Sequence, residues 1–233
     1  MNAQSFIDAG LHYTPHSFTV PLDYQDASKG TIEVFARAVC LVGDEESTKP
    51  WLVYFQGGPG FPSPRQNGNN GWVKRALQEY RVLLLDQRGT GNSSMVNHQT
   101  LAHFTPQQQA EYLSHFRADN IVRDAEYIRE QFGVEKWAIL GQSFGGFCSL
   151  TYLSLFPDSL LQSWFKFFYL YEQTKNSNSI CSNSRVRNTK FPGVISLRND
   201  FPTWAIPKGG FFRDVVSTLR KLVNIPWAVS GRR

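Results

Sequence analysis

A serine set among glycines carries the clearest chemical signal of the sequence, in the run Gly141-Gln142-Ser143-Phe144-Gly145-Gly146. The G-x-S-x-G pattern is typical of a sharp turn between a strand and a helix that presents the serine hydroxyl as a nucleophile. Such a serine needs a base to take its proton, and in folds built this way an acid and then a histidine follow it along the chain. All five histidines precede Ser143 here, namely His12, His16, His98, His103 and His115. The sequence therefore predicts a nucleophile without the histidine that would activate it.

Two backbone amides are candidates for stabilising the oxyanion that forms when Ser143 attacks a carbonyl group. Phe144 follows the serine, and its N–H lies at the start of a predicted helix, where backbone N–H groups are free to bind negative charge. Gly58 lies in the run Gln56-Gly57-Gly58-Pro59-Gly60, directly after a predicted buried strand. Glycines there let the backbone approach a substrate closely, and Pro59 stiffens the turn. The opposing interpretation is that both glycine-rich runs are only structural turns.

A third polar run, Asp86-Gln87-Arg88-Gly89-Thr90-Gly91-Asn92-Ser93, also follows a predicted buried strand. Asp86 and Arg88 could contact a substrate from this position. The interpretation we favour is that they form a buried network that supports the glycine-rich loop of the oxyanion hole.

Strand and helix patterns alternate along the first two thirds of the chain. Continuous apolar runs, typical of buried parallel strands, cover Trp51–Phe55, Tyr80–Asp86 and Lys136–Leu140. An antiparallel hairpin is predicted ahead of them, with strands at Thr19–Tyr24 and Thr31–Val39. Helices are predicted at Gly71–Glu79, from a capping Asp119 to a terminating Gly133, and at Phe144–Phe156. This order predicts an α/β fold with a mainly parallel sheet flanked by helices.

Charge divides the 233 residues into two segments. Residues 1–161 hold 12 Lys and Arg against 16 Asp and Glu, a net charge of −4, whereas residues 162–233 hold 12 against 3, a net charge of +9. We therefore expect residues 1–161 to form the N-terminal part of the core and residues 162–233 to form an atypical basic tail. Strand and helix periodicity does not persist in the tail, although Phe211–Val223 has the pattern of one amphipathic helix. The tail is interpreted either as a cap (lid) fragment or as non-native sequence from a frameshift or an unspliced segment.

Several classes of protein are disfavoured by the sequence. The cationic residues of the tail are scattered rather than gathered with aromatic residues, which argues against nucleic-acid binding. No signal-peptide pattern is visible at the N-terminus, and no apolar stretch approaches the roughly 18 residues of a membrane span. The three cysteines, Cys40, Cys148 and Cys181, share no metal-ligand spacing, and Cys148 is expected in the core behind Ser143. We expect a cytoplasmic protein with reduced thiols and without a metal, cofactor, nucleic-acid or membrane partner; the oligomeric state stays open.

Taken together, the motifs resemble those of the prolyl aminopeptidase (proline iminopeptidase) family of α/β-hydrolase serine peptidases. The resemblance covers about residues 15–161 and rests on four runs in order, Tyr54–Phe61, Leu84–Gly91, Ala118–Glu126 and Gly141–Cys148. It implies an α/β-hydrolase-type fold and a peptide substrate whose N-terminal proline is released through an acyl-enzyme on Ser143. It also implies an oxyanion held by N–H groups near Gly58 and Phe144, and no cofactor. Gln56 stands where many members have histidine.

The resemblance does not extend to an acid and a base. The family's acid and base lie in its C-terminal half, and the aspartates after Ser143 lie in no matching motif; these are Asp158, Asp200 and Asp214. We therefore expect a fold that is incomplete in its C-terminal half and a chain that is weakly active or inactive. The alternatives are an esterase of the same fold and a non-catalytic binding protein that keeps the pocket. Because the sheet of this fold continues past the strand before Ser143, a chain ending at Phe156 would expose that strand's edge unless the tail covers it.

Overall fold

The computed structural model of the chain describes residues 4–65, 71–166 and 195–198. Its strands are β1 (Phe6–Asp8), β2 (Leu11–Pro21), β3 (Thr31–Leu41), β4 (Trp51–Phe55), β5 (Arg81–Asp86), β6 (Trp137–Gln142), β7 (Leu160–Lys166) and β8 (Ile195–Arg198). Its helices are α1 (Gly71–Ala76), α2 (Pro106–Ser114), α3 (Ala118–Gln131) and α4 (Phe144–Leu155), with 3₁₀ turns η1 (Ala27–Lys29) and η2 (Pro157–Ser159). The helix predicted at Phe211–Val223, together with Cys181, Asp200 and Asp214, lies outside the described residues.

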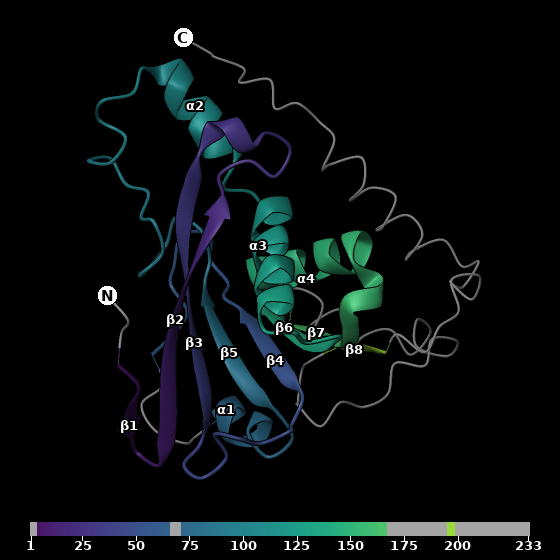
Figure 1. Ribbon diagram of the computed structural model, residues 1–233. Helices are drawn as coiled ribbons and strands as arrows, with labels where there is room; N and C mark the ends of the chain where they lie inside the picture. The colour runs from purple at the N-terminus through teal and green to yellow at the C-terminus, as the bar shows by residue number, and fades with distance from the viewer. Residues whose placement is uncertain (1–3, 66–70, 167–194, 199–233) are drawn as a thin grey trace, which may run out of the picture. The chain divides into compact units, whose positions relative to one another are not determined.

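Within the described residues the strands form one sheet in the order β1-β2-β3-β5-β4-β6-β7-β8 (Figure 1). Parallel pairing is confined to its centre, where β4 pairs with β5 and β6, and β6 pairs with β7. The predicted hairpin is the antiparallel β2–β3 pair on one flank, and β8 pairs antiparallel with β7 on the other. Tyr54 of β4 lies opposite Leu84 of β5 and Leu140 of β6. The three predicted buried strands therefore end at the same edge of the sheet.

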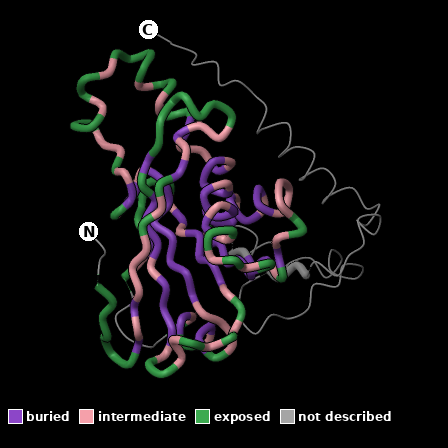
Figure 2. The backbone as a smooth tube through the Cα atoms, in the orientation of Figure 1, coloured by how far each residue is buried: buried purple, intermediate pink, exposed green. Residues whose placement is uncertain are grey.

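Side chains of the central strands alternate between two apolar layers. Val53 and Phe55 belong to the layer that packs against α3 and α4, whereas Leu52 and Tyr54 belong to the layer that packs against α1. Helices α3 and α4 lie next to each other on one side of the sheet (Figure 1). The central strands are buried along almost their whole length (Figure 2). Burial on both faces explains why their sequences are continuously apolar rather than alternating.

Helix α3 begins earlier than the sequence predicts. Asp119 is not the N-cap: the cap is Arg117, without a side-chain cap bond, and Asp119 lies in the first turn. The helix starts at Ala118 because this residue is itself buried in the core, and an acidic residue in the first turn is favourable against the helix dipole. The predicted end is confirmed, since Phe132 is the C-cap and Gly133 follows with φ of 62°.

The strand that leads to Ser143 is covered on both sides. β7 pairs in parallel with β6 from Leu160 to Lys166, and the expected continuation of the sheet is confirmed. The first residues of the basic tail thus cover the edge that a chain ending at Phe156 would expose. β7 crosses the boundary predicted at residue 161, so the sheet includes the start of the basic segment; the division into core and tail stays a prediction.

Glu126 of α3 joins the elements around the start of β7. Its carboxylate accepts hydrogen bonds from Tyr152 of α4 and from Ser159 of η2 (2.7 Å), and it pairs with Arg129 (2.6 Å). Trp137, the first residue of β6, donates from Nε1 to the Tyr152 hydroxyl (3.1 Å). Burial opposes ionisation of Glu126, but the bonds from Arg129, Tyr152 and Ser159 outweigh it and lower the pKa of the carboxyl. One charged network therefore fixes α3, α4, β6 and the entry to β7.

Arg88 and Asp124 form an ion pair that is removed from solvent, with side-chain exposures of 0% and 1%. The guanidinium donates to both carboxylate oxygens, at 2.7 Å from Nε and 2.5 Å from Nη2. Tyr24 donates to the same carboxylate (2.9 Å), and Arg88 Nη1 donates to the carbonyl groups of Leu22 (2.9 Å) and His115 (2.8 Å). Burial raises the pKa of Asp124, and the bonds from Arg88 oppose that rise. The pair ties the end of β2 and the end of α2 to α3.

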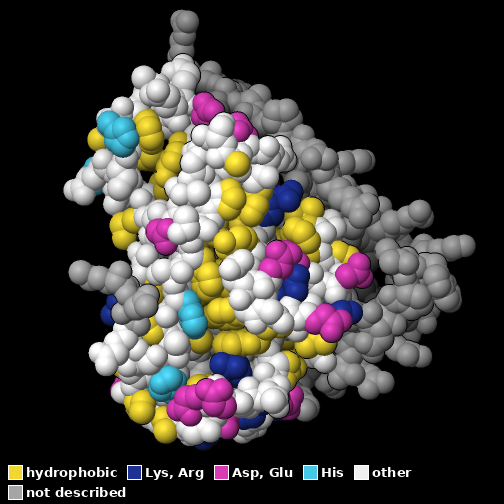
Figure 3. All heavy atoms as spheres, in the orientation of Figure 1, with side chains coloured by type: hydrophobic (Ala, Val, Ile, Leu, Met, Phe, Trp, Pro, Cys, Tyr) yellow, Lys and Arg dark blue, Asp and Glu magenta, His cyan; other side chains and the backbone are white. Residues whose placement is uncertain are grey.

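None of the helices in the described residues is long and apolar enough to cross a membrane. Lysine and arginine side chains do not gather into one patch on the face drawn in Figure 3, where both signs of charge are interspersed over the described residues.

Asp124→Ala leaves the buried guanidinium of Arg88 without a counter-charge, so we expect it to lower the free energy of unfolding by about 3–5 kcal/mol. The control is Asp119→Ala on the same helix, which removes only a first-turn charge and is expected to cost about 1 kcal/mol or less. Urea denaturation followed by circular dichroism measures both. Equal losses for the two variants would contradict the assignment of Arg88–Asp124 as a structural pair.

Candidate active site

Ser143 joins β6 to α4 in a backbone conformation that serine rarely adopts. Its φ is 52° and its ψ is −114°. Among the described non-glycine residues, only Ala9 and Ser143 have positive φ. A conformation of this kind costs about 1–3 kcal/mol and persists only where the surroundings enforce it. The side chain of Ser143 is exposed, so the predicted nucleophile protrudes from a strained turn.

Three glycines allow the backbone to close around this turn. A Cβ on Gly145 would overlap the carbonyl group of Phe55 at the end of β4, and a Cβ on Gly141 would overlap the carbonyl group of Gly145. At Gly57, an added Cβ would lie 3.0 Å from the Cβ of Ser143. The start of α4, the end of β6 and the glycine-rich loop after β4 therefore meet at one point, at a separation that only glycine permits.

The two predicted oxyanion donors belong to the segments that meet there. Gly58 follows the contact residue Gly57, with φ of 58°, and its carbonyl accepts a hydrogen bond from Phe61 N–H (3.2 Å) that closes the turn. Phe144 is the first residue of α4, where a backbone N–H has no carbonyl partner within the helix. The structure thus brings the Gly58 turn and the Phe144 helix start to the Ser143 turn; their action on an oxyanion stays a prediction.

Asp86 holds the far end of the glycine-rich loop. Its carboxylate accepts from the backbone N–H groups of Ser63 (2.9 Å) and Asn92 (3.0 Å). Gln87 donates from its side chain to the carbonyl of Gln56 (3.1 Å), at the loop's near end. The supporting network expected around Asp86 is therefore present and buried.

Arg88 is not part of this support. It was grouped with Asp86 by the sequence, but its guanidinium pairs with Asp124 and binds the end of β2 instead. Arg88 lies two residues beyond the end of β5, outside the strand, and α3 supplies a buried carboxylate for the arginine.

A cavity of about 340 Å³ lies against the loop. Its lining includes apolar, cationic, amide and carboxylate side chains, among them those of Phe61, Pro62, Pro64, Arg37, Arg65, Gln56 and Asp86. The volume lies within the range of small-ligand sites.

Comparison with known proteins agrees with this geometry. Residues 50–163 match a family model described as the alpha/beta hydrolase fold. The chain is 63% identical over 153 residues to a proline iminopeptidase of Aeromonas sobria, covering 65% of this chain and 36% of the relative. Over these residues the chain is similar to a proline iminopeptidase. A second proline iminopeptidase, of Aspergillus aculeatus, is 42% identical over 156 residues, which cover 62% of this chain and 34% of that relative.

The chain has the α/β-hydrolase fold, which confirms the fold class expected from the sequence. Among solved structures, an alpha/beta hydrolase from Novosphingobium aromaticivorans matches with a TM-score of 0.45 and 16% identity, covering 68% of this chain and 44% of that one. The chain spans about a third of the length of the curated relatives it matches.

The five histidines lie in β2, between β5 and α2, and directly after α2. His16 lies in β2, four strands from β6 in sheet order, or about 19 Å at the usual strand spacing. His12 lies opposite Cys40, next to the start of β5, and so at the other edge of the sheet from Ser143. The Nδ1 of His115 lies 3.8 Å from a carboxylate oxygen of Asp23. The two others lie between β5 and α2, where His103 packs against Phe104.

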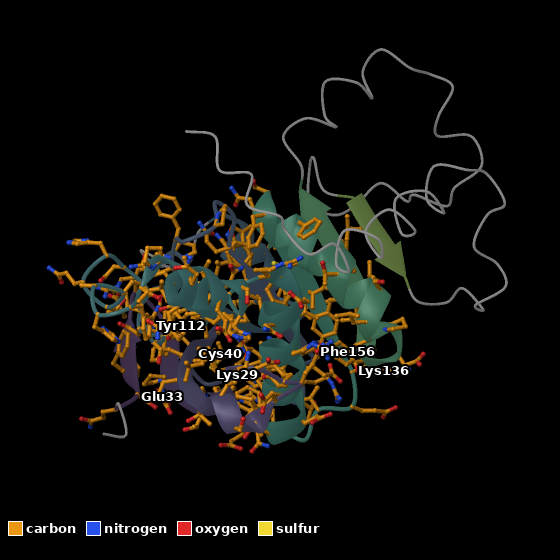
Figure 4. All side chains as sticks on the ribbon, turned by 90° about the horizontal axis from the view of Figure 1, so that it is seen from above. Lys29, Glu33, Cys40, Tyr112, Lys136 and Phe156 are labelled. Carbon is orange, nitrogen blue, oxygen red and sulfur yellow. The ribbon has the colours of Figure 1, made fainter. Side chains whose placement is uncertain are left out.

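Asp158 is excluded as the acid partner of Ser143 by its place in the fold. It is exposed in η2, directly before β7, and β7 runs parallel to β6. Ser143 follows the end of β6, so Asp158 lies at the opposite edge of the sheet. After α4 the chain comes back to the edge at which β6 begins. In Figure 4, Lys136, just before β6, and Phe156, just after α4, lie at the same end of the view.

Sequence reasoning assigned no role to Tyr54, Gln56 or Gln142, although all three belong to the quoted motifs. Their side chains meet beside the Ser143 turn, as Tyr54 lies within 2.9 Å of both glutamine side-chain oxygens. The available signal was periodicity: Tyr54 and Gln56 are two residues apart, and Gln142 is two residues beyond the strand partner of Tyr54. These spacings place the three side chains on one face.

Gly57→Ala places a Cβ 2.5 Å from the Gln142 carbonyl oxygen and 3.0 Å from the Ser143 Cβ, so it pushes the loop away from the nucleophile. We expect a loss of about 1–3 kcal/mol in stability and a roughly 100-fold slower reaction of Ser143 with a fluorophosphonate, the cost of losing one oxyanion donor. Gly30→Ala, in the β2–β3 hairpin, is the control because its Cβ meets open space, and the strain of its φ of 86° is confined to that hairpin turn. Equal reactivity of the two variants would show that the loop contact does not shape the site.

Proposed function

We propose that this chain carries the nucleophile and the oxyanion hole of a serine exopeptidase that releases N-terminal proline from peptides. The observation that supports this most directly is the strained, exposed Ser143 in contact with the glycine-rich loop, within a segment 63% identical to a proline iminopeptidase. A cytoplasmic location, in which Cys40 and Cys148 stay reduced, is part of the same proposal.

In the proposed reaction, Ser143 Oγ attacks the carbonyl carbon of the N-terminal proline. The carbonyl oxygen becomes an oxyanion that accepts hydrogen bonds from the N–H groups of Gly58 and Phe144. The bond to the next residue breaks, the shortened peptide leaves as an amine with the proton taken from the serine, and a prolyl ester remains on Ser143. Water then hydrolyses this ester, which restores the serine hydroxyl and releases proline.

The proton taken from Ser143 needs an acceptor, and no histidine follows Ser143 in the sequence. Loss of a triad histidine costs about a million-fold in kcat in the best-studied serine peptidase, and a residual 10³–10⁴-fold acceleration over water remains from the oxyanion hole and binding. We therefore expect these 233 residues to react slowly at Ser143 and to turn substrate over weakly.

The missing histidine also favours a second candidate, a non-catalytic protein that keeps the pocket and binds peptides with an N-terminal proline. A folded chain that binds such a peptide at micromolar concentration, while Ser143 remains unlabelled by a fluorophosphonate, would support this candidate over the enzyme.

Chemical rescue tests the proposed function. The chain is incubated with prolyl-β-naphthylamide over a series of imidazole concentrations, with Ser143→Ala as the control. We expect slow naphthylamine release that rises with imidazole, because neutral imidazole can take the serine proton. Ser143→Ala is expected to show neither the basal rate nor the rise. A rate that is the same in both chains contradicts the proposal.

Substrate class separates the peptidase from an esterase of the same fold. We expect amides of N-terminal proline to react in preference to short acyl esters, after each rate is corrected for its uncatalysed reaction. A preference for acyl esters lacking proline would instead support an esterase.

A further inference from the structure

One hydroxyl group lies between the two sequence motifs that build the site. Tyr54 of β4 points its Oη at the side-chain Oε1 of Gln56 and at the side-chain Oε1 of Gln142, each at 2.9 Å. Gln56 directly precedes Gly57, and Gln142 directly precedes Ser143. The three side chains therefore connect the residues on either side of the Gly57–Ser143 contact.

Tyr54 is firmly held in this position. It is 3% exposed, and its ring stacks on Trp72 of α1 with ring centroids 4.7 Å apart and an interplanar angle of 26°. Burial raises the pKa of the Tyr54 hydroxyl to about 12, so it stays protonated at any pH at which the protein would work. The group is a permanent hydrogen-bond donor and acceptor beside the site.

The hydrogen-bonding capacities of the three groups require that one glutamine accepts from the hydroxyl and the other donates to it. The hydroxyl has a single hydrogen and so donates to one carboxamide oxygen. The other glutamine must present its NH2 group to the hydroxyl oxygen, which is allowed because the two ends of a carboxamide occupy equivalent positions. The result is a chain of two hydrogen bonds from Gln56 through Tyr54 to Gln142. Removing the hydroxyl breaks both bonds at once.

We propose that Tyr54 is a positioning residue whose hydroxyl holds the Gly57–Gly60 loop in register with Ser143. This inference rests on the proposed function for its consequence, since the register matters only if an oxyanion forms there. The far end of the loop is held by Asp86 through Ser63; at the near end Gln87 binds the backbone carbonyl of Gln56, and Tyr54 binds the Gln56 side chain. Catalytic groups need placement within about 0.5 Å, and fixing both ends of a glycine-rich loop meets that need.

Hydrogen exchange tests whether Tyr54 positions the loop, and it does not require the chain to be active. The variant is Tyr54→Phe, which keeps the ring against Trp72 and removes only the hydroxyl. The reporters are the Phe61 amide, bonded to the Gly58 carbonyl, and the Gly146 amide, bonded to the Ser143 carbonyl. We expect both to exchange about two- to tenfold faster, the effect of losing one or two ordinary hydrogen bonds.

The matched control is Tyr80→Phe, which removes a tyrosine hydroxyl near Gln162 at the opposite edge of the sheet. It is expected to leave both reporters at their original rates. Gln142→Met is a second variant that keeps side-chain length and loses the amide; combined with Tyr54→Phe it should add little, because both changes break the same chain of bonds. Unchanged reporters in Tyr54→Phe, or equal acceleration in Tyr80→Phe, would overturn the proposal.

Fluorophosphonate labelling then separates this inference from the proposed function. We expect Tyr54→Phe to lower the maximal labelling rate of Ser143 about two- to tenfold at unchanged reagent binding, whereas a general loss of structure would change both. An unlabelled starting chain would count against the proposed function alone, and the exchange rates would still decide the role of Tyr54. Normal labelling kinetics in Tyr54→Phe would overturn the positioning role.

Discussion

The site depends on a close approach of backbone segments that only glycine allows. At the carboxyl edge of the parallel strands, the start of α4 lies against the end of β4, and the loop after β4 lies against the turn at Ser143. A methyl group at Gly57, Gly141 or Gly145 would occupy space already filled by backbone or by Ser143 itself. The glycines of the G-x-S-x-G run are therefore required by backbone packing. The consequence is that the loop after β4, the turn at Ser143 and the start of α4 meet at the place where we expect a nucleophile and two oxyanion donors.

A strained serine needs surroundings that resist relaxation. β6 is held between β4 and β7, so the strand before Ser143 cannot shift towards an open edge. Behind it, Glu126 joins α3 to α4 and to η2 before β7, which fixes the helix that starts at Ser143. These contacts are spread over four elements, and each is worth about 1 kcal/mol or somewhat more. Together they exceed the strain of about 1–3 kcal/mol at one residue.

Local patterns predicted the parts of the fold that depend on neighbouring residues. The continuous apolar runs of the central strands and the glycines around Ser143 are such patterns, and the structure contains them. The capping box at Thr105–Gln108 was an available signal for α2 that the sequence reading passed over. The continuation through Leu160–Lys166 was obscured because the charge reversal falls inside this strand. The Arg88–Asp124 pair joins residues 36 apart and the Tyr54–Gln142 contact joins residues 88 apart, so the pattern within either segment alone does not show that the two segments meet.

The orientation of the sheet limits where a base for Ser143 can come from. Lys166 at the end of β7 lies opposite Gln142 at the end of β6, so β7 ends at the edge that carries the nucleophile. In open α/β sheets ligands bind outside the carboxyl ends of the strands, and segments leaving that edge supply the reacting groups. Among the described histidines, those of β2 are strands away, and the Nδ1 of His115 lies 3.8 Å from an Asp23 carboxylate oxygen. An acceptor for the serine proton must therefore come from a segment that leaves this edge, or from solvent. Added imidazole distinguishes a site that lacks only its base from a site in which Ser143 does not react.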